Sequence, residues 1–421
     1  SGPAAAWSGR CTVDVMLTST PRLNWVLLIV YALATIGVLA GAFISPTFRG
    51  LAYAPLRDFV VPPPRPIVVD VLYSTEKAAW ITEAVDRFQK SGKRLDGRPI
   101  ELELSKSGSR EMYLAVLDGN ARPDLISPAS MLQISLLEDL SAARTGAFKG
   151  PVVDRGDAQT CRAVLNTPVV LVAWKNRADV LWGDRPNGDL WLHLHDAVTE
   201  DTWEAHGHSE WGFIKFGQTN PLKSNSGFQT FLLMTYNYAG KTSGLSNADI
   251  LDVDFQSWYR EFGRNVTKFG DSTGTFMEEI VAYGPSQYDI VAVYEATAIE
   301  HIENAVARYG ARYGGLRVIY PPVTSLSDHP FCVLQAEWVT PAEAQAARVF
   351  LDFLTSHEMQ QLALQHGFRP VDETIPLEDA GSPFPRYEAN GVRLDLPQQV
   401  EVPAGNVLNT MLEFWARNVQ P

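Results

Sequence analysis

Residues 67–73 read IVVDVLY and lead directly into Ser74-Thr75. A short apolar run rich in β-branched residues predicts a buried strand. The residues that follow show helical periodicity, with apolar side chains recurring on one face. The residues on that face are Trp80, Ile81, Ala84, Val85 and Phe88. The stretch therefore predicts a strand, a polar loop and an amphipathic helix in succession.

The same order of strand, loop and helix recurs twice in the next residues. Residues 100–104 form a second apolar strand, Ser107-Gly108-Ser109 a turn, and residues 112–117 open a helix. Leu125-Ile126 then leads through residues 127–130 into a further apolar helix. Three such units in close succession predict a parallel sheet of the doubly wound kind.

The loops after these strands are rich in hydroxyl groups, namely those of Ser74, Thr75, Ser107, Ser109 and Ser127. In open α/β sheets, ligands bind beyond the carboxyl ends of the strands, where helices begin. Hydroxyls and free N–H groups at helix starts suit anions and other polar oxygens. Ser and Thr are also common N-caps, which accounts for any single loop without a ligand. Their recurrence favours a shared binding site.

The second half of the chain repeats this arrangement. The strand-like residues 212–217 precede a polar loop that contains Asn220, Ser224 and Ser226, and an apolar helix follows over 228–236. A second polar loop, 271–275, contains Thr273 and precedes a helix over 276–282. Residues 289–293 predict a strand that ends in Tyr294-Glu295. Two more apolar runs, 167–174 and 330–339, are placed where the chain could cross between two lobes.

In their order along the chain, these motifs resemble the type 2 solute-binding proteins of bacterial transporters, closest to the branch of molybdate- and sulfate-like binders. The resemblance covers about residues 67–420. The motifs that carry it are residues 73–77, 107–109, 123–130, 207–212, 219–227, 284–289 and 366–370.

The resemblance implies two doubly wound α/β lobes joined by hinge strands, which close over a ligand. Lobe 1 would comprise residues 67–172, lobe 2 residues 173–325, and residues 326–421 a return to lobe 1 with a C-terminal extension. In oxyanion-binding relatives, neutral hydroxyls and backbone N–H groups at helix starts hold the ligand.

Carried over residue by residue, the resemblance places Ser74 in the first-strand loop, Ser107 or Ser109 in the second, and 224–226 at the helix start across the cleft. Tyr294 matches the position near the second crossover. Glu295 departs from the oxyanion pattern, because a carboxylate near the cleft would favour a cation or a polyol. The full set of candidate ligand-binding residues is Ser74, Thr75, Ser107, Ser109, Ser127, Asn220, Ser224, Ser226, Thr273, Tyr294 and Glu295.

The N-terminal part predicts a membrane anchor. No charged residue occurs between Leu23 and Phe48, and about 20 apolar residues span a bilayer as a helix. We therefore predict an N-terminal segment over 1–22, a transmembrane helix over 23–45, and a proline-rich linker over 46–66. A cleaved signal peptide is the alternative, because Ala40-Gly41-Ala42 fits a small-x-small cleavage site.

Composition and charge exclude several other classes of protein. The 421 residues carry a net charge of −13, which argues against binding of nucleic acid through its phosphates.

Four histidines lie close together in the sequence, namely His193, His195, His206 and His208. Such a cluster could bind zinc, but the spacing of these histidines favours packing and capping roles. We predict no metal and no cofactor. For Cys161 and Cys332, a disulfide and two buried free thiols remain the alternatives.

Taken together, the sequence predicts a non-catalytic solute-binding protein, anchored in the cell membrane with its folded part on the extracytoplasmic side. It would clamp a small polar ligand, such as an oxyanion, and present it to a permease of an ABC transporter. The alternative is a structural subunit of a membrane complex that has the same fold and no ligand.

Overall fold

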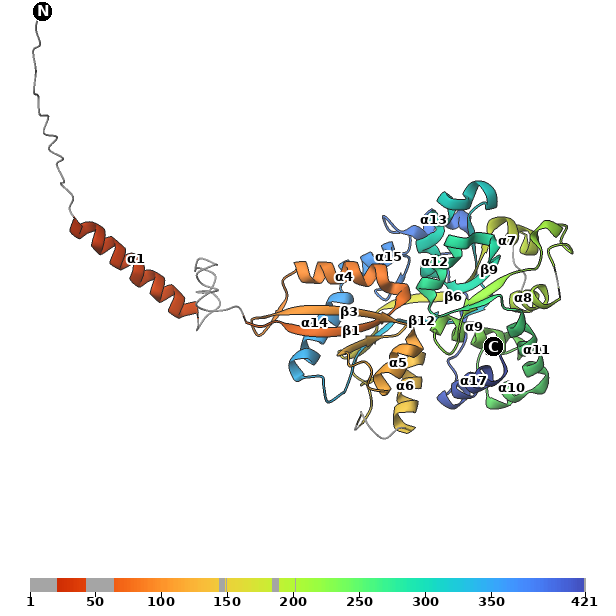
Figure 1. Cartoon of the computed structure of the whole chain (residues 1–421), viewed down its shortest axis with the longest axis horizontal. Coiled ribbons are helices and arrows are strands. Elements are labelled where there is room, and N and C mark those ends of the chain that lie inside the picture. Colours follow the sequence, from red (N-terminus) through yellow and green to blue (C-terminus); the bar gives the residue numbers. More distant parts are fainter. Residues whose placement is uncertain are drawn as a thin grey trace, which may run out of the picture. The chain divides into compact units, whose positions relative to one another are not determined.

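The structure, a computed structural model, describes residues 21–42, 64–143, 148, 150–183, 189–200 and 202–419 (Figure 1). The chain divides into two compact units, Ser1–Arg65 and Pro66–Pro421. Residues 1–20 of the predicted N-terminal segment, residues 43–45 of the predicted transmembrane helix and residues 46–63 of the predicted linker lie outside the described residues.

The apolar segment near the N-terminus forms helix α1 (Pro21–Ala42). Its large side chains are exposed to solvent, Trp25 by 66% and Tyr31 by 73%. Among the residues that the structure describes, no helix is both long enough and apolar enough to cross a bilayer. The prediction of a transmembrane helix over residues 23–45 is therefore not supported.

The first lobe is built on a mixed sheet with a parallel centre. Strand β1 pairs in parallel with β3 and with β4, as the repeated strand–loop–helix units predict. Strand β13 adds to β4 in antiparallel orientation, and β5 adds to β13 in the same way. In spatial order the strands are β2 (Arg94–Leu95), β3 (Arg98–Ser107), β1 (Ile67–Ser74), β4 (Leu125–Ser127), β13 (Pro330–Val333) and β5 (Cys161–Ala163).

Helices cover both faces of this sheet because successive residues of β1 point to opposite sides. Val69 and Val71 pack with α4, α14 and α15, whereas Leu72 packs with α5 and α6 on the other face. Figure 1 shows α4 on one side of β1 and β3 and α5 with α6 on the other. The helices are α4 (Ala78–Lys90), α5 (Ser109–Leu117), α6 (Met131–Ala143), α14 (Pro341–Leu354) and α15 (His357–Gln365).

The second lobe has the same layered construction. Strand β7 pairs in parallel with β8 and β9, and β6 runs antiparallel to β9 and β10. In spatial order the strands are β10 (Leu316–Ile319), β6 (Leu165–Trp174), β9 (Ile290–Tyr294), β7 (Phe216–Thr219) and β8 (Lys268–Gly270). The two-lobed α/β fold predicted from the sequence is confirmed.

The residues of β6 alternate between two helical layers. Val170 and Val172 pack with α12 and α13, and Val169 and Leu171 pack with α8, α9 and α11. The helices of this lobe are α7 (Lys175–Trp182), α8 (Leu190–Thr199), α9 (Asn225–Tyr238), α10 (Asn247–Leu251), α11 (Val253–Asn265), α12 (Thr273–Tyr283) and α13 (Glu295–Tyr313). Short 3-10 turns occur at η1 (Thr75–Lys77), η2 (Ser209–Trp211) and η3 (Gly284–Ser286).

The chain crosses between the two sheets at neighbouring places. It passes from β5 to β6, and it returns through β12 (Leu326–Ser327), which pairs with β6, into β13. Cys161 and Cys332 lie directly opposite each other on β5 and β13 and form a disulfide, with the two sulfur atoms 1.98 Å apart. The alternative of two free thiols is wrong. A disulfide fits an oxidising compartment.

The C-terminal extension packs largely on the second lobe. Strand β14 (Arg369–Pro370) pairs with β6, and β15 (Gln398–Gln399) pairs with β11 (Val323–Thr324). Between them lie α16 (Pro383–Arg386) and η4 (Glu388–Asn390). The last helix, α17 (Gly405–Asn418), contacts α10 of the second lobe and also α6 of the first. The limits of the lobes at residues 172 and 325 stay a prediction.

Candidate ligand-binding site

The candidate residues of the first lobe lie at the carboxyl ends of its parallel strands. Ser74 ends β1, Ser107 ends β3, and the two are register partners. Ser127 ends β4 and lies opposite Tyr73 of β1. Ser109 begins α5, where its Oγ accepts a hydrogen bond from the N–H of Ala129 at 3.0 Å. The structure therefore brings these loops to one edge of the sheet.

The candidate residues of the second lobe form a compact hydroxyl cluster. Ser226 Oγ lies 2.7 Å from Thr219 Oγ1 and 2.8 Å from Thr273 Oγ1, and Ser224 Oγ lies 3.2 Å from Thr273 Oγ1. All four side chains are buried and bond to one another. The side chain of Asn220 stabilises the turn in which it lies, because its Oδ1 accepts a hydrogen bond from the N–H of Leu222 at 2.8 Å.

The two lobes touch where these loops meet. The N–H of Arg110 donates to Lys223 O at 3.1 Å, and the N–H of Gly274 donates to Thr75 Oγ1 at 3.3 Å. A Cβ at Gly108 would lie 2.8 Å from Lys223 O, and one at Gly274 would lie 2.9 Å from Thr75 O. Both positions therefore need glycine for the backbones to approach so closely.

A buried ion pair, not foreseen from the sequence, lies beside Ser74. Lys77 Nζ donates to Ser74 Oγ at 2.6 Å, to Ser127 O at 2.8 Å and to Pro128 O at 3.3 Å. It also lies 3.5 Å from Glu76 Oε1, which accepts the hydroxyl hydrogen of Ser74. The side chains of Lys77 and Glu76 are 0% and 4% exposed.

Burial and the attraction between Lys77 and Glu76 have opposite effects on the pKa values of the two groups. Burial lowers the pKa of Lys77 to about 8, although the Glu76 carboxylate opposes the change. For Glu76, burial alone would raise the pKa, but the charge of Lys77 and the contacts of His329 and Ser74 outweigh it and lower the pKa to about 2. Both groups are thus charged at neutral pH.

His329 completes this cluster from the crossover between β12 and β13. It is fully buried, and its backbone adopts a positive φ of 37°, which is uncommon for a residue other than glycine. Its Nδ1 lies 3.2 Å from Glu76 Oε1 but without hydrogen-bond geometry, and neither ring nitrogen has a hydrogen-bond partner. Burial, aided by the nearby Lys77 ammonium, lowers the pKa of His329 to about 4.

A chain of amide and hydroxyl groups links the lobes next to this cluster. Gln133 Nε2 of α6 donates to Asn225 Oδ1 of α9 at 2.8 Å, and Asn225 Nδ2 donates to Tyr294 Oη at 2.8 Å. Tyr294 also packs edge-on against His329, with the ring centroids 5.9 Å apart. We refer to these groups together as the interlobe polar layer, which consists of Ser74, Glu76, Lys77, Ser127, Gln133, Asn225, Tyr294 and His329.

Several polar atoms in the interlobe polar layer have no hydrogen-bond partner. Among the described residues, these atoms include Ser127 Oγ, Gln133 Oε1 and both ring nitrogens of His329. Buried polar atoms are nearly always paired in folded proteins, so a group of unpaired ones is unusual. Unsatisfied donors and acceptors, here from the first lobe and from the crossover segment, are what a polar ligand would engage.

Glu295 lies outside the interlobe polar layer. Its carboxylate accepts from Arg369 Nε at 2.8 Å and from Arg369 Nη2 at 2.7 Å, and it also accepts the hydroxyl hydrogen of Tyr320. Burial raises the pKa of Glu295, although the Arg369 guanidinium opposes this. The carboxylate is thus occupied by the C-terminal extension, so we do not include Glu295 in the site proposed below.

The structure gives no support to a metal site at the histidine cluster. His195 stacks on Trp258 with ring centroids 4.4 Å apart, and His208 stacks on Trp211 at 3.8 Å. Within the part of the chain that the structure describes, no group of three or more His, Cys, Asp or Glu side chains could hold a metal ion.

The buried imidazole predicts a specific pH dependence of stability. The pKa of His329 falls from 6.5 in the unfolded chain to about 4 in the fold, so the unfolded state takes up a proton first as the pH is lowered. The contribution to stability is present above pH 6.5 and is lost towards pH 4. We expect the wild type to lose about 2–3 kcal/mol more unfolding free energy than His329→Asn between pH 7.5 and 4.5.

Urea titrations at the two pH values measure this difference. Asparagine is a suitable replacement because it tolerates a positive φ and does not titrate. Titrating groups far from His329 affect both proteins alike, and Glu76→Gln in both backgrounds removes the one carboxyl group whose pKa His329 also lowers. Equal losses in the two proteins would contradict a buried neutral His329.

Two α/β lobes joined by adjacent crossing segments, with polar groups of both lobes facing each other, define the architecture of two-lobed binding proteins. Residues 69–369 match the family described as bacterial extracellular solute-binding protein. The match covers well over half of the chain, and the protein belongs to this family. The relatives that it matches are named as binding proteins and not as enzymes.

Individual relatives bind different ligands. The thiosulfate-binding protein of Pseudomonas aeruginosa is 22% identical over 308 residues, which cover 72% of this chain and 77% of that protein. The sulfate-binding protein of Mycobacterium tuberculosis H37Rv has a TM-score of 0.51 and 17% identity, over 79% of this chain and 93% of that one. A periplasmic thiamin-binding protein has a TM-score of 0.56 and 15% identity, over 85% and 99%.

Proposed function

We propose that this protein closes its two lobes over a small polar ligand at the interlobe polar layer and delivers it to a membrane permease of the ABC type. The observation that carries the proposal is the set of unpaired buried atoms, Ser127 Oγ, Gln133 Oε1 and the nitrogens of His329. These atoms come from the first lobe and from a crossover segment, and Gln133 already reaches across to Asn225 of the second lobe.

The charges of the layer bear on the class of ligand. Lys77 and Glu76 neutralise each other, and His329 is neutral near pH 7 because its pKa is about 4. A ligand would therefore meet hydroxyl, amide and imidazole groups near the starts of α5 and α9, where the N–H groups of Arg110 and Gly227 already donate within the protein. Helix N-termini favour anions, so an oxyanion is the first candidate, as the thiosulfate- and sulfate-binding relatives also suggest.

Isothermal titration calorimetry and thermal unfolding with thiosulfate, sulfate, molybdate, thiamin and simple polyols test the proposal. A true ligand raises the unfolding free energy by about 2.7 kcal/mol when its concentration is a hundred times its dissociation constant. A well-folded protein that responds to no member of the panel would contradict a clamping role for these ligand classes.

Once a ligand has been identified, Ser127→Ala tests whether the ligand contacts the interlobe polar layer. The Oγ of Ser127 is fully buried and has no partner within the described part of the protein, so Ser127→Ala removes no internal hydrogen bond there. We expect this change to weaken binding by about 0.5–1.5 kcal/mol, the usual value of one hydrogen bond, with little loss of unfolding free energy. Calorimetry of the variant measures the first quantity and urea titration the second.

Ser226→Ala is the matched control for Ser127→Ala. Ser226 Oγ is equally buried, but it bonds to Thr219 and Thr273 within its own lobe. The control should lower stability more than affinity. Ser74 is less informative, because its hydroxyl already bonds to Glu76 and Lys77. Unchanged affinity in Ser127→Ala would remove this hydroxyl from the site.

We propose the cellular location of the protein and its permease partner from its family. Membership in an extracellular solute-binding family implies that the folded unit lies outside the cytoplasm, and the Cys161–Cys332 disulfide is consistent with this. Attachment to the membrane through residues 23–45 stays a prediction. It is not supported by the structure, in which no helix of the described residues is long enough and apolar enough to cross a bilayer. The permease is proposed from the way that such proteins usually work.

One observation favours a second candidate function, that of a subunit without a ligand. The lobes already touch, and Lys77 finds its hydrogen-bond acceptors within the protein. A protein that has lost its ligand would keep such internal pairing. Purification from the membrane with a stoichiometric partner, together with no response to the ligand panel, would favour this candidate over transport.

A further inference from the structure

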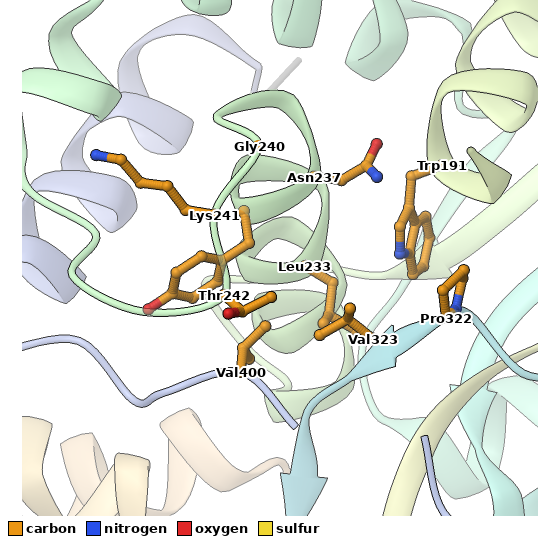
Figure 2. Close-up of a pocket in the computed structure, with 10 residues that line it drawn as sticks. Trp191, Leu233, Asn237, Gly240, Lys241, Thr242, Pro322, Val323 and Val400 are labelled. Atoms are coloured by element: carbon orange, nitrogen blue, oxygen red, sulfur yellow. The ribbon is translucent and has the colours of Figure 1, made fainter. Parts of the chain in front are cut away.

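A separate cavity lies in the second lobe, away from the interlobe polar layer. Its volume is about 190 Å³. Figure 2 shows the residues that surround it, which come from α8, from the end of α9 with the loop that follows, from the segment at β11, and from Val400 directly after β15. Leu233, Val323 and Val400 give it an apolar wall. None of the residues of the interlobe polar layer lines it.

Two polar groups of this cavity have no partner in the described part of the protein. Trp191 is 2% exposed, and its Nε1–H finds no acceptor. In Figure 2 the indole nitrogen of Trp191 faces the interior of the group of lining residues. Asn237 also lines the cavity, and its Oδ1 finds no donor. A buried N–H without an acceptor is rare, so it points to a hydrogen-bonding partner from outside the chain.

The charged residue among those that line the cavity is already paired. Lys241 lines it, but its Nζ donates to both carboxylate oxygens of Asp249 at 2.8 Å. In Figure 2 the ammonium end of Lys241 points away from the other lining side chains. A charged guest would therefore lose its hydration without gaining a counter-charge, which is costly.

We propose that this cavity is a second binding site, which takes a small neutral molecule with an apolar ring or branched body. Such a guest would carry a hydrogen-bond acceptor for Trp191 Nε1–H and a donor for Asn237 Oδ1. A cavity of about 150 Å³ holds benzene, so the present one has room for a ring with a small polar substituent. A primary carboxamide on a ring meets all these requirements.

Benzamide is the probe that matches this chemistry. We expect saturable binding of benzamide to the full chain, followed by saturation-transfer NMR and by tryptophan fluorescence. Toluene, which lacks the polar group, and benzoate, which is charged, should bind more weakly. Trp191→Phe and Asn237→Leu each remove one hydrogen bond and should weaken benzamide binding about two- to tenfold.

Two control variants test whether benzamide binds in this cavity and not elsewhere on the protein. Trp258→Phe changes a tryptophan of the same lobe that stacks on His195 outside the cavity, and it should leave benzamide binding unchanged. Ser127→Ala, in the interlobe polar layer, should also leave it unchanged. No saturable binding to the wild type, or equal binding to the wild type and both cavity variants, would overturn the proposal.

Discussion

Lys77→Met should lower the unfolding free energy by about 3–5 kcal/mol, because removing one partner of a buried ion pair leaves the other charge uncompensated. The change removes the ammonium that bonds to Ser74 Oγ, Ser127 O and Pro128 O. It also leaves the Glu76 carboxylate buried, with only 4% of its side chain exposed. Urea unfolding followed by far-UV circular dichroism measures the loss.

Two further variants are the controls for Lys77→Met. Glu76→Gln combined with Lys77→Met removes both charges and should recover much of the stability. Lys90→Met breaks an exposed pair with Asp86 on α4, where the side chains are 74% and 56% exposed, and should change little. If Lys77→Met were as stable as Lys90→Met, the buried pair would not be a structural element.

Replacing both Cys161 and Cys332 by alanine should lower the unfolding free energy by about 2–5 kcal/mol. The disulfide joins residues that are 171 positions apart, and a cross-link over a long loop restricts the unfolded chain more than one over a short loop. Differential scanning calorimetry should show a lower melting temperature for the double variant.

A reductant provides the matched control for this second prediction. Dithiothreitol should lower the melting temperature of the wild type and leave that of the double variant unchanged, which separates the covalent link from the packing of the two side chains. A wild type that is insensitive to the reductant under unfolding conditions would contradict a stabilising disulfide.

The strands and helices of both lobes could be predicted from the sequence because their periodicity is local. The strand expected over residues 67–73 is observed as Ile67–Ser74, and the helix expected over 276–282 is observed as Thr273–Tyr283. Boundaries were less accurate where tertiary contacts decide them. The strand expected over 212–217 is observed as Phe216–Thr219, since its partners in the sheet are β8 and β9.

The sequence predicts which hydroxyl-bearing loops lie near the candidate site, but it does not predict the buried ion pair of Glu76 and Lys77. The hydroxyl loops do gather at one edge of each sheet, because the carboxyl ends of parallel strands meet there. Glu76 and Lys77 follow Ser74 closely, but nothing local indicates that both would be buried. That depends on Ser127 and His329, which approach from distant parts of the chain. The pairing of Glu295 with Arg369 likewise joins residues 74 positions apart.

The helix at the end of the chain has a consequence for the rate at which a ligand would leave. Helix α17 contacts α10 of the second lobe and α6 of the first, and the Cα of Gly405 comes so close to Asp139 that a Cβ there would lie 1.9 Å from Oδ2. Moving the lobes apart must therefore break the contact of α17 with one of them. The residence time of a ligand between the lobes would then depend on how fast this C-terminal contact breaks, and not only on the hydrogen bonds to the ligand itself.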